Sequence, residues 1–444
     1  MQLSASTEGL QLPREPAAGS TLERQMLARV NLVLERARDT SFYRDRLAGL
    51  PTQIESLSEL RAFPMTTKEE VLADIAARPP FGSRLRVAPS AIRHIVETSG
   101  TSGTGQEVYA LDEEDERMVW EMAARGFAWA GVDERAVVLN TLPLGTSAAG
   151  QWYYHALRLL GANVLEVGSH STARKLGYLE RFAPDTLVGT PSYVFRLAVE
   201  ARRHGIDTSR GSVKGLIVAG ESWSLQWMQR LESEWGARVF EQYGCTQRGM
   251  AWSCPEGGVA GDRRGVLHAL SDCGVYEVLD PETGAPVREG RGHLVLTPFA
   301  SSASPLVRFA TGDCVTVVPG CGCGRPGPCL QAGTVERFDF MVKIRGVNVW
   351  PEALDAALFA IEGVREYEAS VETDADGREQ LQVQLELESD LSDTPTRARA
   401  AIREVTGLGA EVTVVSEGAI SRAVEARFKK RRRLHDRRTT AAGG

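Results

Sequence analysis

Five short apolar runs between residues 136 and 240 alternate with segments in which apolar residues recur at helical spacing. The runs lie at 136–139, 162–165, 186–188, 215–218 and 238–240. Runs of this length with few polar residues are typical of strands that are buried on both faces, and helices are the usual connections between parallel strands. The alternation therefore predicts an α/β fold built around a parallel sheet.

The pattern changes on both sides of this region. Residues 274–318 read as short strands joined by tight turns, which indicates a more antiparallel, barrel-like β subdomain. Apolar residues at helical spacing from residue 22 predict an amphipathic helix that ends near 41–43.

A third region begins at residue 339. Strands are expected at 366–371, 380–387 and 411–415, and helices at 352–361 and 394–405. We therefore predict a large N-terminal domain over residues 1–338, with parallel sheets and the barrel-like subdomain. A small, mobile α+β domain over 339–444 follows it.

Composition excludes several classes of protein. The chain has 444 residues, 43% of them hydrophobic, and a formal net charge of −7, so it can form a core and lacks the overall basic charge of a nucleic-acid binder. No apolar stretch is long enough to span a bilayer, and the polar N-terminus does not resemble a signal peptide. We expect a cytoplasmic protein that binds neither a membrane nor nucleic acid.

A loop rich in glycine and hydroxyl residues follows the strand expected at 94–97. Between Glu97 and Gln106 it holds three glycines and five hydroxyl residues in the order Thr-Ser-Gly-Thr-Ser-Gly-Thr-Gly. Glycines let the backbone approach an anion, and amide and hydroxyl groups can bind phosphate oxygens, although a plain flexible loop has the same composition. No lysine follows in the manner of a P-loop, so a P-loop kinase is not expected.

The same loop resembles the phosphate loop of adenylate-forming enzymes, the superfamily of acyl-CoA synthetases, adenylation domains and luciferases. Three further motifs of that superfamily follow in order: Tyr-Gly-Cys-Thr-Gln at 243–247, Thr-Gly-Asp at 311–313, and Glu-Arg-Phe-Asp at 336–339 with Lys-Ile-Arg-Gly at 343–346. The closer resemblance is to the phenylacetate-CoA ligase branch. It is carried by Ser-Phe-Tyr-Arg at 41–44, Pro-Met-Thr-Thr-Lys at 64–68 and Gly-Val-Asn-Val-Trp-Pro at 346–351.

The resemblance implies a nucleotide site. The β- and γ-phosphates of ATP would contact Thr98, Ser99, Gly100, Thr101, Ser102, Gly103 and Thr104. The rest of the nucleotide would contact Gly220, Glu221, Ser222, Gln242, Tyr243, Gly244, Asp313 and Arg337. In this scheme Tyr243 flanks the adenine, Asp313 accepts hydrogen bonds from the ribose hydroxyls, and Thr246 contacts the α-phosphate. Asp339 would be the hinge about which the C-terminal domain turns.

Two positions depart from the superfamily pattern. Gln247 stands where a carboxylate usually helps to hold Mg²⁺, and a neutral amide is a weaker ligand for a hard cation. Either the phosphates and water hold the ion, or the first half-reaction is altered. The catalytic lysine of the superfamily has no clear counterpart. Counting back from the Asp-Arg-Arg at 436–438 places Lys430 at the position of that lysine, with Lys429 beside it. The basic run at 429–438 is also compatible with a solvated helix end or, less readily, with a tail that binds nucleic acid.

The cysteines indicate a metal site. All seven lie between 245 and 329, an odd number that does not fit a disulfide scaffold. Cys254, His268, Cys321 and Cys323 would make a closed Cys₃His set for structural Zn²⁺. Some members of the phenylacetate-CoA ligase branch resemble the chain at these places and bind zinc. Cys329 could substitute for one ligand, and buried reduced cysteines are the alternative.

The sequence gives less information about the acid-binding pocket. The resemblance places it near Leu144, Gly145, Tyr154, Ala219 and Gly220, where small residues would leave room for a flat ring. Aromatic residues such as Tyr154 belong to a core more often than to a ligand wall.

Together these observations predict an AMP-forming ligase that uses ATP and Mg²⁺ to activate an aryl carboxylic acid and then transfers it to coenzyme A. The alternative keeps adenylation but changes the acceptor or substrate, to a carrier-protein thiol, an amine, or nitrite for N–N bond formation in secondary metabolism. A degenerate ligase that acts as a nucleotide or acid sensor is a third possibility. A homodimer is compatible with the sequence but not indicated by it.

Overall fold

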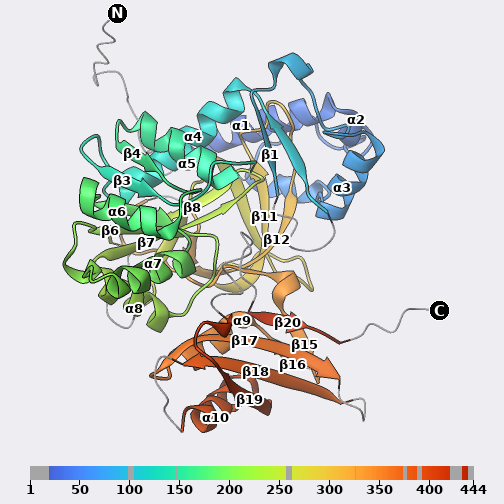
Figure 1. The fold of residues 1–444 in the computed structure, drawn as a ribbon. Helices are drawn as coiled ribbons and strands as arrows, with labels where there is room; N and C mark the ends of the chain where they lie inside the picture. Colours follow the sequence, from blue (N-terminus) through green and yellow to red (C-terminus); the bar gives the residue numbers. More distant parts are fainter. Residues whose placement is uncertain are drawn as a thin grey trace, which may run out of the picture.

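The computed structural model describes residues 20–98, 105–146, 148–256, 263–325, 327–345, 347–373, 378–387, 393–420 and 433–438. In these residues the chain forms two lobes (Figure 1). The N-terminal lobe runs from α1 to β14 and contains a large sheet, whereas the C-terminal lobe runs from β15 to β20 and contains a small one. No helix in these ranges is long and apolar enough to cross a membrane.

The N-terminal lobe contains most of the secondary structure. Its helices are α1 (Ser20–Arg38), α2 (Ser41–Arg44), α3 (Lys68–Ala77), α4 (Glu113–Trp129), α5 (Ala148–Leu159), α6 (Thr172–Phe182), α7 (Pro191–Arg203) and α8 (Leu225–Trp235), with short 3₁₀ turns at Leu57–Ala62, Pro89–Ala91, Thr208–Arg210 and Phe338–Phe340. Its strands are β1 (His94–Glu97), β2 (Val108–Leu111), β3 (Val137–Asn140), β4 (Asn163–Glu166), β5 (Thr186–Gly189), β6 (Gly215–Ala219), β7 (Arg238–Cys245), β8 (Gly249–Ser253), β9 (Val266–Ala269), β10 (Gly274–Leu279), β11 (Gly290–Pro298), β12 (Phe309–Val318), β13 (Cys329–Gln331) and β14 (Glu336–Arg337).

Twelve of these strands form one sheet with the order β10-β11-β12-β13-β9-β8-β7-β6-β5-β3-β4, and β14 pairs with β12. The five apolar runs of the sequence become β3 to β7, and all pairings among these strands are parallel. From β7 onward the pairings are antiparallel. The expected α/β fold is confirmed, and the antiparallel subdomain continues the parallel part of the sheet.

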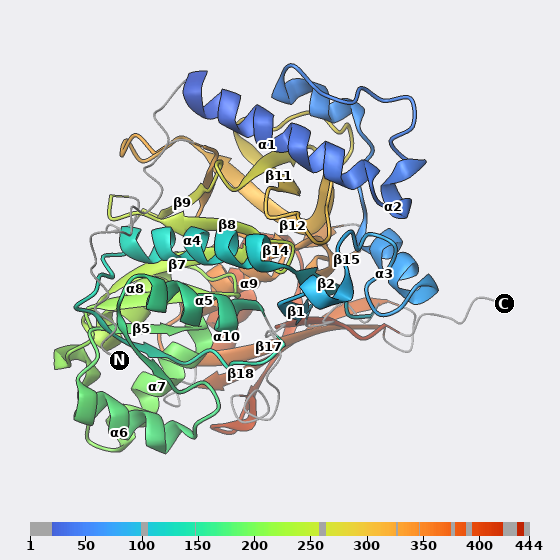
Figure 2. The same ribbon diagram turned by 90° about the horizontal axis from the view of Figure 1, so that it is seen from above.

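Helices cover both faces of the parallel part (Figure 2). Successive side chains of a strand point to opposite faces, so Val188 and Ile217 pack with α4 and α5 while their neighbours Leu187 and Leu216 pack with α6, α7 and α8. Burial on both faces explains why these strands are apolar throughout rather than alternating.

The first helix is shorter than the sequence predicts. It ends at Arg38, and Thr40 then caps a separate short helix by accepting a hydrogen bond from the backbone N–H of Tyr43 at 3.3 Å. The Tyr43 side chain is buried, and its hydroxyl lies 2.8 Å from that of Thr66. The break between α1 and α2 therefore turns Tyr43 into the core instead of continuing the helix on the surface.

The C-terminal lobe contains β15 (Val342–Ile344), β16 (Val347–Val349), α9 (Pro351–Phe359), β17 (Val364–Thr373), β18 (Glu379–Leu387), α10 (Thr394–Thr406), β19 (Ala410–Val415) and β20 (Leu434–Asp436). β15 and β16 form a hairpin, and the other strands form a sheet of order β19-β18-β17-β20. The elements lie where the sequence indicates an α+β unit. The domain limits at 338 and 339 stay a prediction.

Tight packing between α4 and β8 gives a stability test. A Cβ added at Gly126 would lie 2.0 Å from the ring of the buried Trp252, whereas one added at Gly177 on α6 would meet nothing within 4 Å. We expect Gly126→Ala to lower the free energy of unfolding by about 1–3 kcal/mol or more, because the ring and helix must separate. Gly177→Ala is the control and should be neutral or stabilising by up to about 1 kcal/mol. Denaturation followed by circular dichroism measures both, and equal effects of the two variants would contradict this packing.

Candidate active site

The candidate site lies at one edge of the large sheet. The C-terminal ends of parallel strands share an edge, and ligands of open α/β sheets bind there. Leu144 and Gly145 follow β3, Ala219 ends β6 and Gly220 follows it, and Tyr243 lies near the end of β7. The topology therefore brings residues from three separate sequence motifs to the same edge.

Tyr243, Asp313 and Arg337 form one cluster at this edge. The buried Tyr243 hydroxyl donates a 2.6 Å hydrogen bond to Asp313 Oδ2, and burial and the charge of Asp313 hold the pKa of Tyr243 well above its usual range, so the phenol stays protonated. Arg337 on β14 lies directly opposite Asp313 on β12 in the strand pairing. The Arg337 guanidinium lies 3.6 Å from Asp313 Oδ1 and donates a 2.9 Å hydrogen bond to the carbonyl of Thr311. The structure thus brings together three residues that the sequence assigns to the nucleotide site.

Gln242 and Glu221 both bond to protein groups. The buried Gln242 side chain accepts a hydrogen bond from the Tyr153 hydroxyl and donates to the carbonyl of Tyr243. Glu221 accepts from the backbone N–H and the hydroxyl of Ser192 at 3.0 and 2.7 Å, which ties the loop after β6 to the start of α7. These contacts tie the two side chains to α5 and to the start of α7. Gly244 is exposed, and Ser222 is half-buried.

The base of the glycine-rich loop is closed by a pair of hydrogen bonds. The Thr98 N–H donates to the carbonyl of Glu107 at 3.0 Å, and the Glu107 N–H donates to the Thr98 hydroxyl at 2.9 Å. The backbone N–H of Glu97 donates to the carbonyl of Thr146 at 3.0 Å, so the loop begins beside the segment after β3. The predicted phosphate contacts Ser99, Gly100, Thr101, Ser102, Gly103 and Thr104 lie outside the described residues.

Gln247 is bonded to a residue that the sequence analysis did not single out. Its amide nitrogen donates to Glu107 at 2.7 Å and lies 3.2 Å from the Tyr109 hydroxyl. Glu107 directly follows the glycine-rich loop, but 140 residues separate it from Gln247, so spacing gives no signal for this contact. Thr246 is half-buried beside Gln247.

The region of the expected hinge is packed by aromatic rings. The Phe338 ring lies 5.4 Å from that of His293 and 5.7 Å from that of Trp350, between centroids. Arg291 stacks 3.9 Å from the Trp350 ring centroid and pairs with Glu336 at 2.8 Å. The Asp339 backbone lies in the 3₁₀ turn here, but its side chain is outside the described part of the structure, as are Lys429 and Lys430.

The residues predicted for the acid pocket differ in their exposure. Leu144 and Gly145 are exposed, and Tyr154 is half-buried with its ring 5.3 Å from that of His155. The neighbouring Tyr153, which the sequence does not distinguish from Tyr154, is buried under the nucleotide motif through its bond to Gln242.

A hollow lies between the two lobes next to this edge. It is lined by Pro191, Glu221, Ser222, Trp223, Ser224, Trp227, Asp355, Phe359 and Arg433. The first six come from the N-terminal lobe and the last three from the C-terminal lobe. Both lobes therefore contribute walls beside the loop that contains Glu221.

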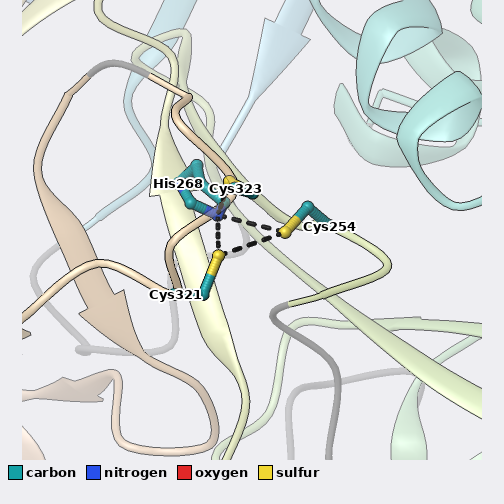
Figure 3. A group of neighbouring side chains, drawn as sticks. All are labelled: Cys254, His268, Cys321 and Cys323. Atoms are coloured by element: carbon teal, nitrogen blue, oxygen red, sulfur yellow. Dashed lines mark hydrogen bonds between the residues drawn. The ribbon is translucent and has the colours of Figure 1, made fainter.

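A second cluster contains cysteine and histidine (Figure 3). The ligand atoms of Cys254, His268, Cys321 and Cys323 all lie within 4.8 Å of one another. His268 Nε2 is 3.3, 3.4 and 3.5 Å from the sulfurs of Cys254, Cys321 and Cys323. A tetrahedral zinc ion with ordinary bond lengths would set such S···N edges at about 3.6 Å.

Cys329 has a different position. Its sulfur lies 3.5 Å from His268 Nδ1, the other ring nitrogen. Cys329 is therefore a partner behind the histidine, where groups that orient metal ligands are found, rather than a substitute for one of the four. The four residues fit a closed zinc set.

Comparison with known proteins identifies the family. The chain is 31% identical over 363 residues to a phenylacetate-coenzyme A ligase of Thermus thermophilus, covering 79% of this chain and 77% of that protein. It is 27% identical to the Escherichia coli enzyme of the same name, covering 93% and 94%. Residues 346–438 match the family described as AMP-binding enzyme C-terminal domain.

A solved 2-hydroxyisobutyryl-CoA ligase in its post-adenylation state aligns with a TM-score of 0.82 and 23% identity over 95% of this chain and 91% of that one. Fold and relatives define the class of the protein as an AMP-forming ligase. The chain belongs to the phenylacetate-CoA ligase branch of the adenylate-forming enzymes.

The chain aligns differently with two states of that solved ligase. In its thioesterification state, with coenzyme A, the same protein aligns with a TM-score of 0.68 over 96% of this chain. The chain as a whole therefore superposes more closely on the post-adenylation structure than on the thioesterification structure.

The hydrogen bond between Tyr153 and Gln242 can be tested directly. Tyr153→Phe leaves the buried Gln242 amide oxygen without this donor, so we expect the free energy of unfolding to fall by about 1–2 kcal/mol. Tyr154→Phe on the same helix is the matched control and should leave stability within about 0.5 kcal/mol. Urea denaturation of both variants makes the measurement, and an unaffected Tyr153→Phe would argue against the bond.

Proposed function

We propose that the chain activates an aryl carboxylic acid with ATP and transfers the acyl group to the thiol of coenzyme A. The observation that carries the proposal is the cluster of Tyr243, Asp313 and Arg337 at the same sheet edge as the base of the glycine-rich loop. Family membership supports acid activation and coenzyme A as the acceptor. The aryl class of the acid rests on the names of the relatives and on the small residues Ala219 and Gly220. ATP and coenzyme A as substrates favour a cytoplasmic location.

In the first step a carboxylate oxygen of the acid attacks the α-phosphorus of ATP, and the bond to the β-phosphate breaks. The products are an acyl adenylate and pyrophosphate. Asp313 would accept hydrogen bonds from the ribose hydroxyls, and Thr246 would contact the α-phosphate. Arg337 and Tyr243 would hold the Asp313 carboxylate in place. Catalysis then comes from alignment and charge neutralisation, to which Lys430 or Lys429 would contribute a cation.

In the second step the thiolate of coenzyme A attacks the acyl carbon, and the bond to AMP breaks. A thiolate is already a good nucleophile, so no elaborate general base is needed. The C-terminal lobe would turn about Asp339 between the steps, which requires the contacts of Phe338 and Trp350 to change.

The proposal is tested by release of AMP and pyrophosphate from ATP with a panel of benzoic, phenylacetic and cinnamic acids, with and without coenzyme A. We expect acid-dependent AMP release that rises with coenzyme A, and an acyl-CoA product by mass spectrometry. Asp313→Asn should raise the KM for ATP about tenfold to a hundredfold, because a charged hydrogen-bond acceptor is lost. Asp280→Asn, in the exposed turn after β10, is the control.

Other outcomes would redirect the assignment. AMP release without a thioester would favour a carrier-protein thiol, an amine or nitrite as the reaction partner. Nucleotide binding without turnover of any acid would favour a sensor. An unchanged KM in Asp313→Asn would remove Asp313 from the site.

We also propose that Cys254, His268, Cys321 and Cys323 hold a structural zinc ion. Three thiolates and an imidazole complete a tetrahedral set and leave no open position, so the ion would link the end of β8, β9 and the loop after β12 without taking part in the reaction.

The zinc proposal predicts about one zinc per chain in protein purified without chelators, measured by elemental analysis. Cys254→Ser should reduce the zinc content by about half or more and lower the melting temperature, because metal binding stabilises the fold. Cys245→Ser leaves the cluster intact and should retain the ion. Absence of zinc from the unmodified protein would favour reduced, unligated cysteines.

A further inference from the structure

We propose that Glu107 is a positioning residue that orients the amide of Gln247 toward the Mg²⁺ of bound ATP, so that two residues together replace a single carboxylate ligand. The inference rests on the proposed function, because it concerns how the same site holds its metal–nucleotide complex. It assigns a role to a residue that no motif contains.

The contact is buried. Glu107 precedes β2, Tyr109 lies within it, and Gln247 follows β7; their side chains are 3%, 0% and 7% exposed. Gln247 Nε2 is 2.7 Å from Glu107 Oε2, and the Tyr109 hydroxyl donates to the same oxygen at 2.5 Å. Gln247 Nε2 also lies 3.2 Å from the Tyr109 oxygen.

The donors and acceptors of these three groups are matched. The Gln247 NH₂ group donates to the Glu107 carboxylate, Tyr109 donates its one proton to the same oxygen, and both partners lie on the same side of the amide nitrogen. Burial and the charge of Glu107 hold the pKa of Tyr109 well above its usual range, so this proton stays in place. If the Gln247 amide were flipped, its oxygen would face the Glu107 carboxylate. Two acceptors would then be in contact without a proton between them, which is unfavourable. Glu107 therefore determines which way the Gln247 amide faces.

The opposite end of the amide has no such partner. Among the residues that the structure describes, no hydrogen bond to the Gln247 amide oxygen is found. A charge-assisted hydrogen bond at the nitrogen draws electron density toward the oxygen, which improves it as a ligand for a hard cation. The arrangement is that of a metal ligand oriented by a carboxylate behind it.

The charge pattern explains why residue 247 is an amide. Two carboxylates 2.7 Å apart would repel each other, and one would have to take up a proton. With glutamine at 247, one negative charge remains at the site and lies 4.0 Å from the Lys68 ammonium.

The position of the pair agrees with a role at the phosphates. Glu107 closes the base of the glycine-rich loop through its backbone bonds with Thr98, and Gln247 lies just beyond the C-terminal end of β7. Gln247 and the described base of the loop therefore belong to the same corner of the site. The residues present fit a magnesium ion that keeps most of its ligands as water and phosphate oxygens.

The test measures binding rather than turnover. Titration calorimetry of the full chain with the non-hydrolysable analogue α,β-methylene-ATP, over a range of Mg²⁺ concentrations, gives the Mg²⁺ dependence of nucleotide affinity. We expect Glu107→Gln to weaken this dependence about tenfold to a hundredfold, because the orienting carboxylate is lost. Gln247→Glu alone should also weaken it at neutral pH, through repulsion between the two carboxylates.

The decisive variant exchanges the two residues. Glu107→Gln with Gln247→Glu restores one carboxylate and one amide in contact, so the Mg²⁺ dependence should return to within about threefold of the unmodified protein. Glu232→Gln on α8, where the carboxylate accepts a bond from the Val239 N–H, is a control for loss of a half-buried charge. A merely structural role would change stability in the single variants without changing the Mg²⁺ dependence.

The outcomes separate this inference from the proposed function. If the unmodified protein binds the analogue with Mg²⁺ but Glu107→Gln binds it with the same Mg²⁺ dependence, the inference is wrong and the proposed function stands. If a single variant does not fold, the inference is tested on the double variant alone. A double variant whose nucleotide affinity does not recover the Mg²⁺ dependence of the unmodified protein would overturn the inference. If the unmodified protein binds no metal–nucleotide complex, the proposed function itself fails.

Discussion

Strand β7 is the element on which the rest of the structure depends, because it pairs in parallel with β6 on one side and antiparallel with β8 on the other. A parallel sheet places strand ends and loops at a common edge, whereas an antiparallel sheet can bring a distant strand back beside it by short turns. At β7 the two arrangements meet. Tyr243 can therefore lie among the loops of the parallel part and still bond to Asp313 on β12, 70 residues later in the chain.

The general architecture could be predicted from the sequence because it depends on local patterns. Burial on both faces makes β3 to β7 uniformly apolar, and this signal does not require knowledge of the neighbours. The end of the first helix was missed because it depends on Thr40, whose capping bond competes with helix periodicity that continues through Tyr43. The pairing order of the antiparallel strands was not predictable for a similar reason. β13 inserts between β12 and β9, an arrangement set by long-range pairing.

In the candidate site, too, local sequence patterns predict some residues, whereas long-range contacts determine others. The sequence predicts Tyr243, Asp313 and Arg337 as site residues because they belong to motifs, and the structure brings the three together. It predicts the Cys₃His set because the cysteines are clustered, and the structure brings these four side chains together as well. It does not single out Glu107, because a glutamate after a loop has no distinguishing pattern. Tyr153 and Tyr154 illustrate the limit most simply, since adjacent residues on a helix point about 100° apart and the sequence alone did not say which faces the core.

The contacts between the lobes combine stable packing with replaceable polar bonds. Phe359 on α9 packs against the apolar cluster of α6, α7 and α8 as well as against the core of its own lobe. Around it, Arg230 donates to the carbonyl of Val364 at 3.3 Å, and Arg203 pairs with Glu417 at 3.0 Å. An exposed ion pair such as that of Arg203 with Glu417 contributes at most about 1 kcal/mol, so it can be exchanged for water at little cost. Phe359 is different, because one ring takes part in two cores. The rotation proposed above would therefore have to remove this ring from the N-terminal lobe, so the Phe359 contact would oppose it.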